Sequence, residues 1–166
     1  MCFKPMTIKK SLLQWPAFLV VLMMFSGCTK MGLYEQTASF KDQEWPASQK
    51  LSFSFNIEDS TKSYYNIYFV LRHADAYHFS NIWINYSIVS PSGPVLEKDA
   101  QEITLASPTA WLGTAMGDIV EQRISLTPNP LQLKKGNYQV SLAQIMREDP
   151  LRNILSAGIR VERVVR

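Results

Sequence analysis

The chain has 166 residues, with 17 basic and 14 acidic side chains and a formal net charge of +3. Lys4, Lys9 and Lys10 precede Cys28 and no acidic residue does, so the chain from Cys28 onward is formally neutral. A neutral remainder without a basic patch argues against nucleic acid as a partner. Its length is that of one domain that can bury its own core.

Residues 1–27 have the order of parts found in a lipoprotein signal peptide. A pair of lysines is followed by an apolar run at residues 12–25, and two small residues precede Cys28. The run is shorter than the roughly 20 residues that a transmembrane helix needs, and this order is typical of secretory signals. A cut directly before a cysteine resembles a bacterial lipobox, in which the thiol takes diacylglycerol and the new amine takes a fatty acid such as palmitate. We therefore expect lipid attachment at Cys28, with an uncleaved apolar helix as the alternative.

Residues 28–50 are predicted to form a lipid-anchored tether that leads into a folded domain at residues 51–166. The tether is polar with isolated large residues, and Trp45 marks the entry to the domain. Because Cys2 leaves with the signal peptide and Cys28 is acylated, no disulfide is expected within the mature chain. The stability of this exported domain must therefore come from packing alone.

From residue 51 onward, apolar and polar residues alternate in short segments, which is typical of half-buried strands. In chain order, the expected strands lie at residues 51–57, 65–72, 82–88, 103–105, 119–126, 138–142 and 159–161. Residues 147–155 are ambiguous, and a helical turn is one interpretation of them. About seven or eight short strands without an amphipathic helix predict an all-β fold. The expected architecture is an antiparallel β-sandwich of jelly-roll or immunoglobulin-like (Ig-like) type, and a closed barrel is the lesser alternative.

The sequence has no recognisable catalytic motif. It lacks G-x-S-x-G, H-E-x-x-H and a glycine-rich phosphate loop, and no free thiol remains after processing. The best metal candidate is the set His73, Asp75 and His78, but its spacing fits no familiar zinc pattern. A solvated loop is the favoured interpretation of these three residues. We therefore expect no enzyme activity, no cofactor and no metal ion.

Aromatic residues are numerous for a single domain, and they allow three interpretations. Their rings can fill the core, form a protein interface, or stack on sugars from one exposed sheet face. A core position is favoured for Trp83, whereas the loop residue Trp111 stays open between core and surface. The rings concerned are those of Tyr64, Tyr68, Tyr77, Trp83, Tyr86 and Trp111.

Several segments, taken in order, resemble one family. The lipobox is followed by Gln43-Glu44-Trp45, Phe53, Phe55, Ile57, the segments 65–72 and 77–83, a Trp-x-Gly loop running into Gly117-Asp118-Ile119, and the segments 146–151 and 158–162. Together they resemble the gliding-motility lipoprotein H family (GldH) of the Bacteroidota. The resemblance implies an outer-membrane lipoprotein that works with protein partners of the gliding-motility and type IX secretion machinery, and it implies no known catalysis. Because no acidic run follows Cys28, we expect the periplasmic face of the outer membrane.

On this interpretation the protein is an accessory or scaffold lipoprotein that contacts its partner through the loops at residues 73–81, 111–118 and 146–152. The candidate contact residues are Arg72, Tyr77, Asn81, Trp83, Trp111, Asp118, Arg147 and Asp149.

The candidate residues are expected to differ in role. Tyr77 and Trp111 are expected to be apolar anchors and Arg147 to pair with a carboxylate, whereas Asn81 and Asp118 would fix loop geometry. Asp149 can instead cap the following turn, and Arg72 can form an ion pair within the domain. The alternative function is a glycan-binding jelly-roll lipoprotein, which coplanar exposed rings on one sheet face would favour and rings buried between the sheets would oppose.

Overall fold

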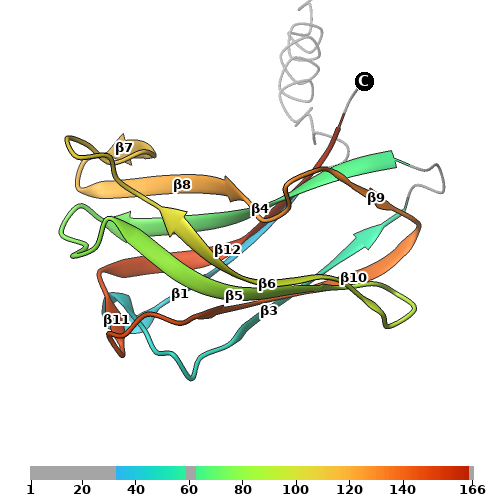
Figure 1. The fold of residues 1–166 in the computed structure, drawn as a ribbon, viewed down its shortest axis with the longest axis horizontal. Helices are drawn as coiled ribbons and strands as arrows, with labels where there is room; N and C mark the ends of the chain where they lie inside the picture. The colour runs from blue at the N-terminus through green and yellow to red at the C-terminus, as the bar shows by residue number, and fades with distance from the viewer. Residues whose placement is uncertain (1–32, 59–62, 165–166) are drawn as a thin grey trace, which may run out of the picture. The chain divides into compact units, whose positions relative to one another are not determined.

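The computed structural model describes residues 33–58 and 63–164, so the predicted signal peptide and Cys28 lie outside the described residues. Within these ranges the chain forms short strands and one 3-10 turn, η2 (Lys41–Gln43) (Figure 1). No helix in the same ranges is long and apolar enough to span a membrane. The strands are β1 (Leu33–Ser39), β2 (Glu44–Trp45), β3 (Leu51–Ile57), β4 (Ser63–Ala74), β5 (Asn81–Val89), β6 (Val95–Thr104), β7 (Thr114–Met116), β8 (Ile119–Ser125), β9 (Leu131–Leu133), β10 (Gly136–Gln144), β11 (Leu151–Arg152) and β12 (Ile154–Arg163).

The strands form two main antiparallel sheets that face each other across a shared core (Figure 1). One sheet has the order β1-β12-β4-β8-β7, with β9 also paired to β4, and the other has the order β3-β10-β5-β6. Strands β2 and β11 form a separate small pair. The eight longest strands, in chain order, are β1, β3, β4, β5, β6, β8, β10 and β12. The first, eighth, third and sixth of these lie side by side in one sheet, and the second, seventh, fourth and fifth lie side by side in the other. This order is that of a jelly roll, so the predicted antiparallel sandwich is confirmed and its type is settled.

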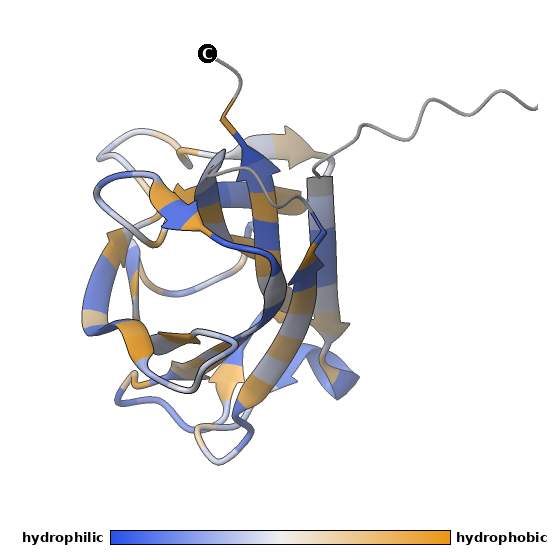
Figure 2. Ribbon diagram, turned by 90° about the vertical axis from the view of Figure 1, so that its right-hand side faces the viewer, coloured by the Kyte–Doolittle hydropathy of each residue, from blue (hydrophilic) through white to orange (hydrophobic). Residues whose placement is uncertain are grey.

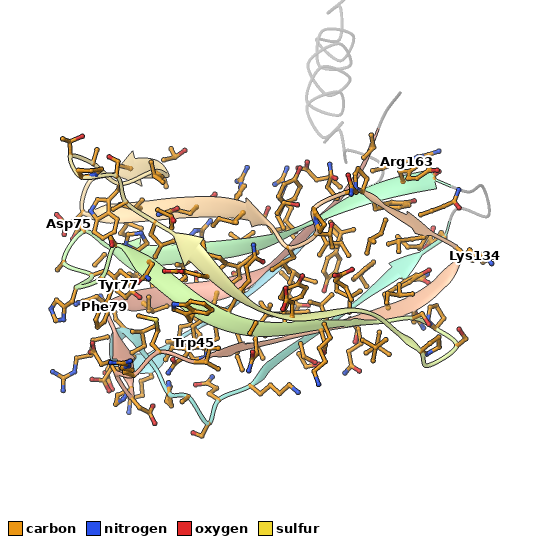
Figure 3. The ribbon with its side chains drawn as sticks, viewed as in Figure 1. Trp45, Asp75, Tyr77, Phe79, Lys134 and Arg163 are labelled. Atoms are coloured by element: carbon orange, nitrogen blue, oxygen red, sulfur yellow. The ribbon has the colours of Figure 1, made fainter. Side chains whose placement is uncertain are left out.

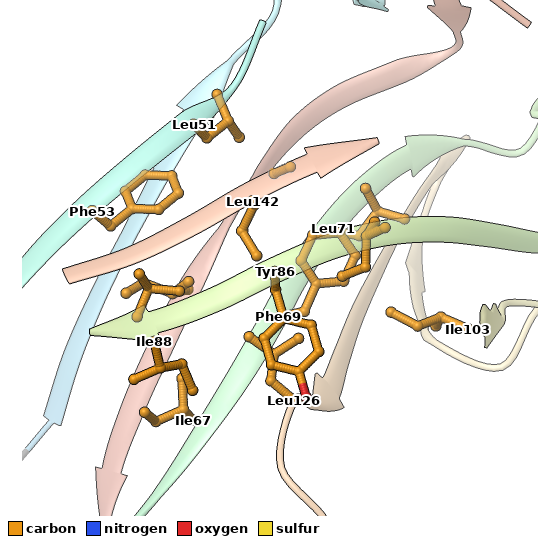
Figure 4. Close-up of a cluster of buried hydrophobic side chains, with 14 of the residues drawn as sticks. Leu51, Phe53, Ile67, Phe69, Leu71, Tyr86, Ile88, Ile103, Leu126 and Leu142 are labelled. Carbon is orange, nitrogen blue, oxygen red and sulfur yellow. The ribbon is translucent and has the colours of Figure 1, made fainter. Parts of the chain in front are cut away.

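Alternation of apolar and polar residues explains why these segments are strands. In β3 the side chains of Leu51, Phe53, Phe55 and Ile57 are buried and those between them are exposed, because successive side chains of a strand point to opposite faces. Figure 2 shows such alternation as orange and blue bands along the strands. The buried faces of both sheets meet in one hydrophobic cluster (Figure 4).

Two segments differ from the sequence-based expectation. Strand β6 begins at Val95 rather than near Ile103, since most of its residues are exposed at a sheet edge and the alternation is faint. Residues 147–155, which the sequence left ambiguous, do not form the helical turn considered for them: Leu151 pairs with Trp45, and β12 begins at Ile154. The second departure depends on Trp45, which is more than a hundred residues away in the sequence, whereas β6 pairs with its neighbour β5 across a short turn.

The folded unit extends into the segment that was expected to be a tether. Its described part begins at Leu33, and β1 pairs along its whole length with β12. Trp45 is completely buried. Strand β1 contains mostly polar residues, so its order comes mainly from backbone pairing with β12, together with the packing of Tyr34 and Ala38 against the core. Of the predicted tether, residues 29–32 stand in the sequence between Cys28 and the first described strand.

Candidate partner-binding surface

The predicted contact loops meet at one end of the sandwich, which we call the loop end. It comprises the connections β4–β5, β6–β7, β7–β8 and β10–β11, residues 75–80, 105–113, 117–118 and 145–150. Backbone hydrogen bonds join these loops: Asp75 N donates to Asp118 O at 2.8 Å, and Leu105 N donates to Ser80 O at 2.7 Å. Figure 3 shows Asp75, Tyr77 and Phe79 together at this end. The loops named from the sequence therefore lie close together, because pairing between distant strands brings them to the same end.

A cluster of four rings forms the base of the loop end. The ring centre of His73 lies 4.5 Å from that of Trp111 and 5.4 Å from that of Tyr77, and Tyr77 contacts Phe79 edge-on at 5.7 Å. The Tyr77 hydroxyl donates to the carbonyl of Asn81 at 3.1 Å. Burial, and then the nearby carboxylate of Glu148, raise the pKa of Tyr77. Tyr77 is 4% exposed, so it leaves almost no surface for a partner and instead holds the loops in place.

His73 lies at the end of β4 and is completely buried, not in the solvated loop where the sequence placed it. Its Nδ1 lies 2.8 Å from the carbonyl of Ala74 and donates to it. The amide nitrogen of Gln122 lies 3.3 Å from His73 Nε2 and donates to Leu105 O at 2.8 Å. One neutral tautomer, with the proton on Nδ1, satisfies all three contacts. Burial lowers the pKa of His73, against a smaller raising effect of the Ala74 hydrogen bond.

The proposed metal set does not come together around this ring. His73 is buried, whereas Asp75 and His78 are exposed on the loop that follows it. Across the described ranges no three His, Cys, Asp or Glu side chains are placed to hold a metal ion.

The buried His73 predicts a pH dependence of stability. Because its pKa is lower in the folded state than the ordinary value of 6.5, the unfolded chain binds a proton first as the pH falls. The free energy of unfolding should therefore decrease from about pH 6.5 downward until the folded-state pKa is reached. Urea unfolding between pH 7 and pH 5.5 should show this decrease in the wild type and in His78→Gln, the exposed control, but a smaller one in His73→Gln. An equal decrease in all three proteins would contradict this assignment.

Arg72, one of the charged candidates, is paired within the domain. Arg72 Nε donates to Glu121 Oε2 at 2.7 Å, and Arg123 contacts the other oxygen of the same carboxylate at 2.7 Å. Burial raises the pKa of Glu121, but the hydrogen bonds and charges of Arg72 and Arg123 outweigh burial and hold it below its usual value. The alternative role of Arg72, an ion pair within the domain, is therefore the one observed.

The polar candidates hold the connections together. The Asn81 amide donates to the Glu102 carboxylate at 2.5 Å, and Asp149 Oδ1 accepts a hydrogen bond from the backbone of Ala47 at 2.8 Å. Asp149 thus joins the β10–β11 loop to the segment after β2 and does not cap a helical turn. Arg147 is exposed, and among the described residues no ion pair is seen for it.

The loop end also carries exposed apolar side chains, and of these the sequence analysis named Trp83 but missed Leu112, Met116 and Ile145. Leu112 is 54% exposed, Met116 63% and Ile145 40%, and Trp83, at 39%, lies beside Ile145, whose backbone N donates to the Trp83 carbonyl at 3.0 Å. Leu112 and Met116 border an open depression of about 640 Å³ whose lining includes Glu121 and Arg123. Large apolar residues within the glycine-containing loop 111–117 were the signal that could have identified them.

The aromatic residues do not gather on one exposed sheet face. Tyr77 and Tyr86 are buried, and Tyr64, Tyr68 and Trp111 are half-buried. The core position expected for Trp83 is wrong: its ring is 39% exposed, because it points to the outside of the four-stranded sheet. Tyr64 and Tyr68 lie instead on strand β4 of the other sheet. By the criterion set from the sequence, this arrangement counts against a glycan-stacking surface.

Comparison with known proteins gives consistent matches along nearly all of the described chain. A family described as GldH lipoprotein matches residues 32–161. The chain is 29% identical over 154 residues to the gliding motility lipoprotein GldH homolog of Christiangramia forsetii, covering 88% of this chain and 93% of that protein. It is also 29% identical over 152 residues to the gliding motility lipoprotein GldH of Flavobacterium johnsoniae, covering 87% and 92%. Among solved structures, the infectious bursal disease virus VP2 subviral particle matches with a TM-score of 0.37 and 12% identity, over 80% of this chain and 32% of that chain.

Proposed function

The chain belongs to the GldH lipoprotein family, and from this premise we propose that it is an accessory or scaffold lipoprotein of the gliding-motility and type IX secretion machinery. In this proposal acyl chains on Cys28 hold the protein in the outer membrane, with its domain on the periplasmic face. The loop end binds an envelope protein of the machinery. The role is one of binding and positioning, without a catalytic step.

The observation that supports this proposal is the arrangement of side chains at the loop end. A cluster of rings holds the loops in place, and exposed apolar side chains, which we call the apolar rim, lie at the same end. The rings of His73, Tyr77 and Trp111 pack together beneath the loops, while Leu112 and Met116 stay more than half exposed. Exposed large apolar residues on a prepared surface are typical of protein interaction sites. Ordered loops also lose little conformational entropy when a partner binds.

Site-specific crosslinking in native membranes tests the proposed contact surface. A photo-crosslinking residue at Leu112 or Ile145 should capture the partner, and one at Ser54, an exposed position in the middle of β3, should not. Met116→Glu should reduce the capture by Leu112 because it places a charge in the apolar rim, whereas Ser54→Glu should leave it unchanged. Thermal unfolding of both variants would show that the fold is retained.

The outcomes separate the two functions considered. Recovery of motility or secretion components through the loop end supports the proposal. Equal capture from Ser54, or recovery of peptidoglycan and polysaccharide alone, contradicts it, and the second result would favour the glycan-binding alternative. Cys28→Ala should release the protein from the membrane fraction if the anchor is the acylated cysteine.

A further inference from the structure

We propose that the end of the sandwich opposite the loop end rests directly on the phospholipid surface, with the β5–β6 hairpin tip among the headgroups and Lys134 and Lys135 beside it. This end, which we call the anchor end, thereby makes a second membrane contact in addition to the acyl chains. The inference rests on the proposed lipid attachment at Cys28. It adds an orientation that neither the family nor the lipid by itself defines.

Strand register places the start of β1 at the anchor end. Leu33 pairs with Glu162 near the end of β12, and Arg163 pairs with Tyr65 near the start of β4. Strand β9 pairs with the same part of β4 and leads directly into Lys134. Figure 3 shows Lys134 and Arg163 at the end opposite Asp75, Tyr77 and Phe79.

The hairpin tip is exposed and uncharged. Residues 90–96 contain two prolines, two serines, a glycine, Val95 and Leu96, with no charged side chain. Val95 is 55% exposed and Leu96 42%. These two are the large exposed apolar residues of the described chain that lie away from the loop end.

The tip packs against the turn that contains the two lysines. A Cβ atom added to Gly136 would lie 2.5 Å from Cγ of Pro91, and Gly136 has φ +143°. Only a glycine permits this close approach together with that backbone conformation. Lys134 and Lys135 therefore flank the apolar tip, and both are exposed. Neither forms an ion pair with another described residue.

The short connection to Cys28 brings this end to the bilayer. Five residue steps separate Cys28 from Leu33, and a fully extended chain spans at most about 3.5 Å per residue, or roughly 17 Å in all. The nine residues of β5 lead away from the loop end over about 30 Å at 3.3 Å per residue. Of the two ends with exposed apolar side chains, the anchor end is thus the one that the acyl chains hold at the membrane.

The residue types at the anchor end fit a bilayer interface. Apolar side chains on a protruding tip can enter the boundary between headgroups and acyl chains, and neighbouring lysines attract anionic headgroups while their apolar stems lie along the surface. Glu58 and Glu97 also lie toward this end, so the end is not uniformly basic, and the attraction depends on the two lysines that flank the tip.

Depth-dependent fluorescence quenching of the full acylated protein tests the orientation. Because Cys2 leaves with the signal peptide and Cys28 is acylated, a single introduced cysteine can be labelled with an environment-sensitive dye. Leu96→Cys reports on the anchor end, and Leu112→Cys is the matched position at the loop end. In vesicles of phosphatidylethanolamine and phosphatidylglycerol with a doxyl-labelled lipid, the dye at position 96 should be quenched several-fold more than the dye at position 112 and should emit further to the blue.

The results that overturn the inference differ from those that overturn the proposed function. Equal quenching at both positions, in protein whose acylation is verified by mass spectrometry, refutes the orientation and leaves the crosslinking result at the loop end unaffected. Protein without an acyl chain refutes the anchor itself and with it this inference. Lys134→Glu with Lys135→Glu should reduce quenching at position 96 in vesicles that contain phosphatidylglycerol. No reduction would refute the role of the lysines.

Discussion

Replacing Trp45 by alanine should lower the free energy of unfolding by about 3–5 kcal/mol, the range for removing a fully buried large side chain. Trp45 is 0% exposed, and its ring stacks on Phe40 with centres 5.0 Å apart. Its indole nitrogen donates to the carbonyl of Gln49 at 3.0 Å. The substitution therefore removes a packed ring, leaves a cavity and leaves a carbonyl without its donor. Urea unfolding of the mature protein in detergent measures the change.

Trp83→Ala is the matched control for this experiment. Trp83 is 39% exposed on the outside of the four-stranded sheet, so its removal should change the free energy of unfolding by less than about 1 kcal/mol. Similar effects of the two substitutions would mean that residues 40–50 do not belong to the cooperative core. They would then act as the tether that the sequence analysis expected.

The contrast between these two tryptophans shows what local sequence can and cannot predict. Alternation identified β3 and most of β4 because their apolar residues recur every second position on one buried face. Trp45 occurs without such a pattern, and its burial depends on Leu151, its partner across the β2–β11 pair more than a hundred residues away. Strand β1 was missed for the same reason, since its order comes from pairing with β12.

The sequence predicted which loops form the candidate surface, but not which of their side chains are exposed on it. Polar and aromatic residues in turns indicated loops that the structure places at one end, because turns carry the residues that sheets exclude. The roles of the candidate residues depend on how deeply each side chain is buried, and local sequence does not determine that depth. Tyr77 is buried beneath the loops and Arg72 is paired with Glu121. The exposed apolar residues Leu112 and Met116 lie in the loop before β7 and at the end of β7, in a segment that was predicted to be a loop because it contains glycines.

Gly158→Ala should weaken the join between β1 and the rest of the domain. Gly158 lies opposite Thr37 of β1. A Cβ at this position would overlap the carbonyl oxygen of Gln36 and lie 2.5 Å from the Cα of Thr37. These are backbone atoms, which cannot rotate away as a side chain can. We expect a loss of about 1–3 kcal/mol in the free energy of unfolding, the usual cost of overpacking, together with faster amide hydrogen exchange in β1 than in β3.

Adding Thr37→Ala to Gly158→Ala distinguishes a backbone clash from a side-chain clash as the cause of the lost stability. It removes the Thr37 methyl group, which would lie 2.8 Å from the added Cβ, but leaves the backbone contacts, so it should not restore stability to Gly158→Ala. Restoration would show that a side-chain contact caused the loss. Separation of β1 would also lengthen the connection between Cys28 and the domain from five residue steps to about twelve, the distance to Phe40. Because a longer connection no longer holds the anchor end near the bilayer, Gly158→Ala should also reduce the lipid quenching of a dye at position 96.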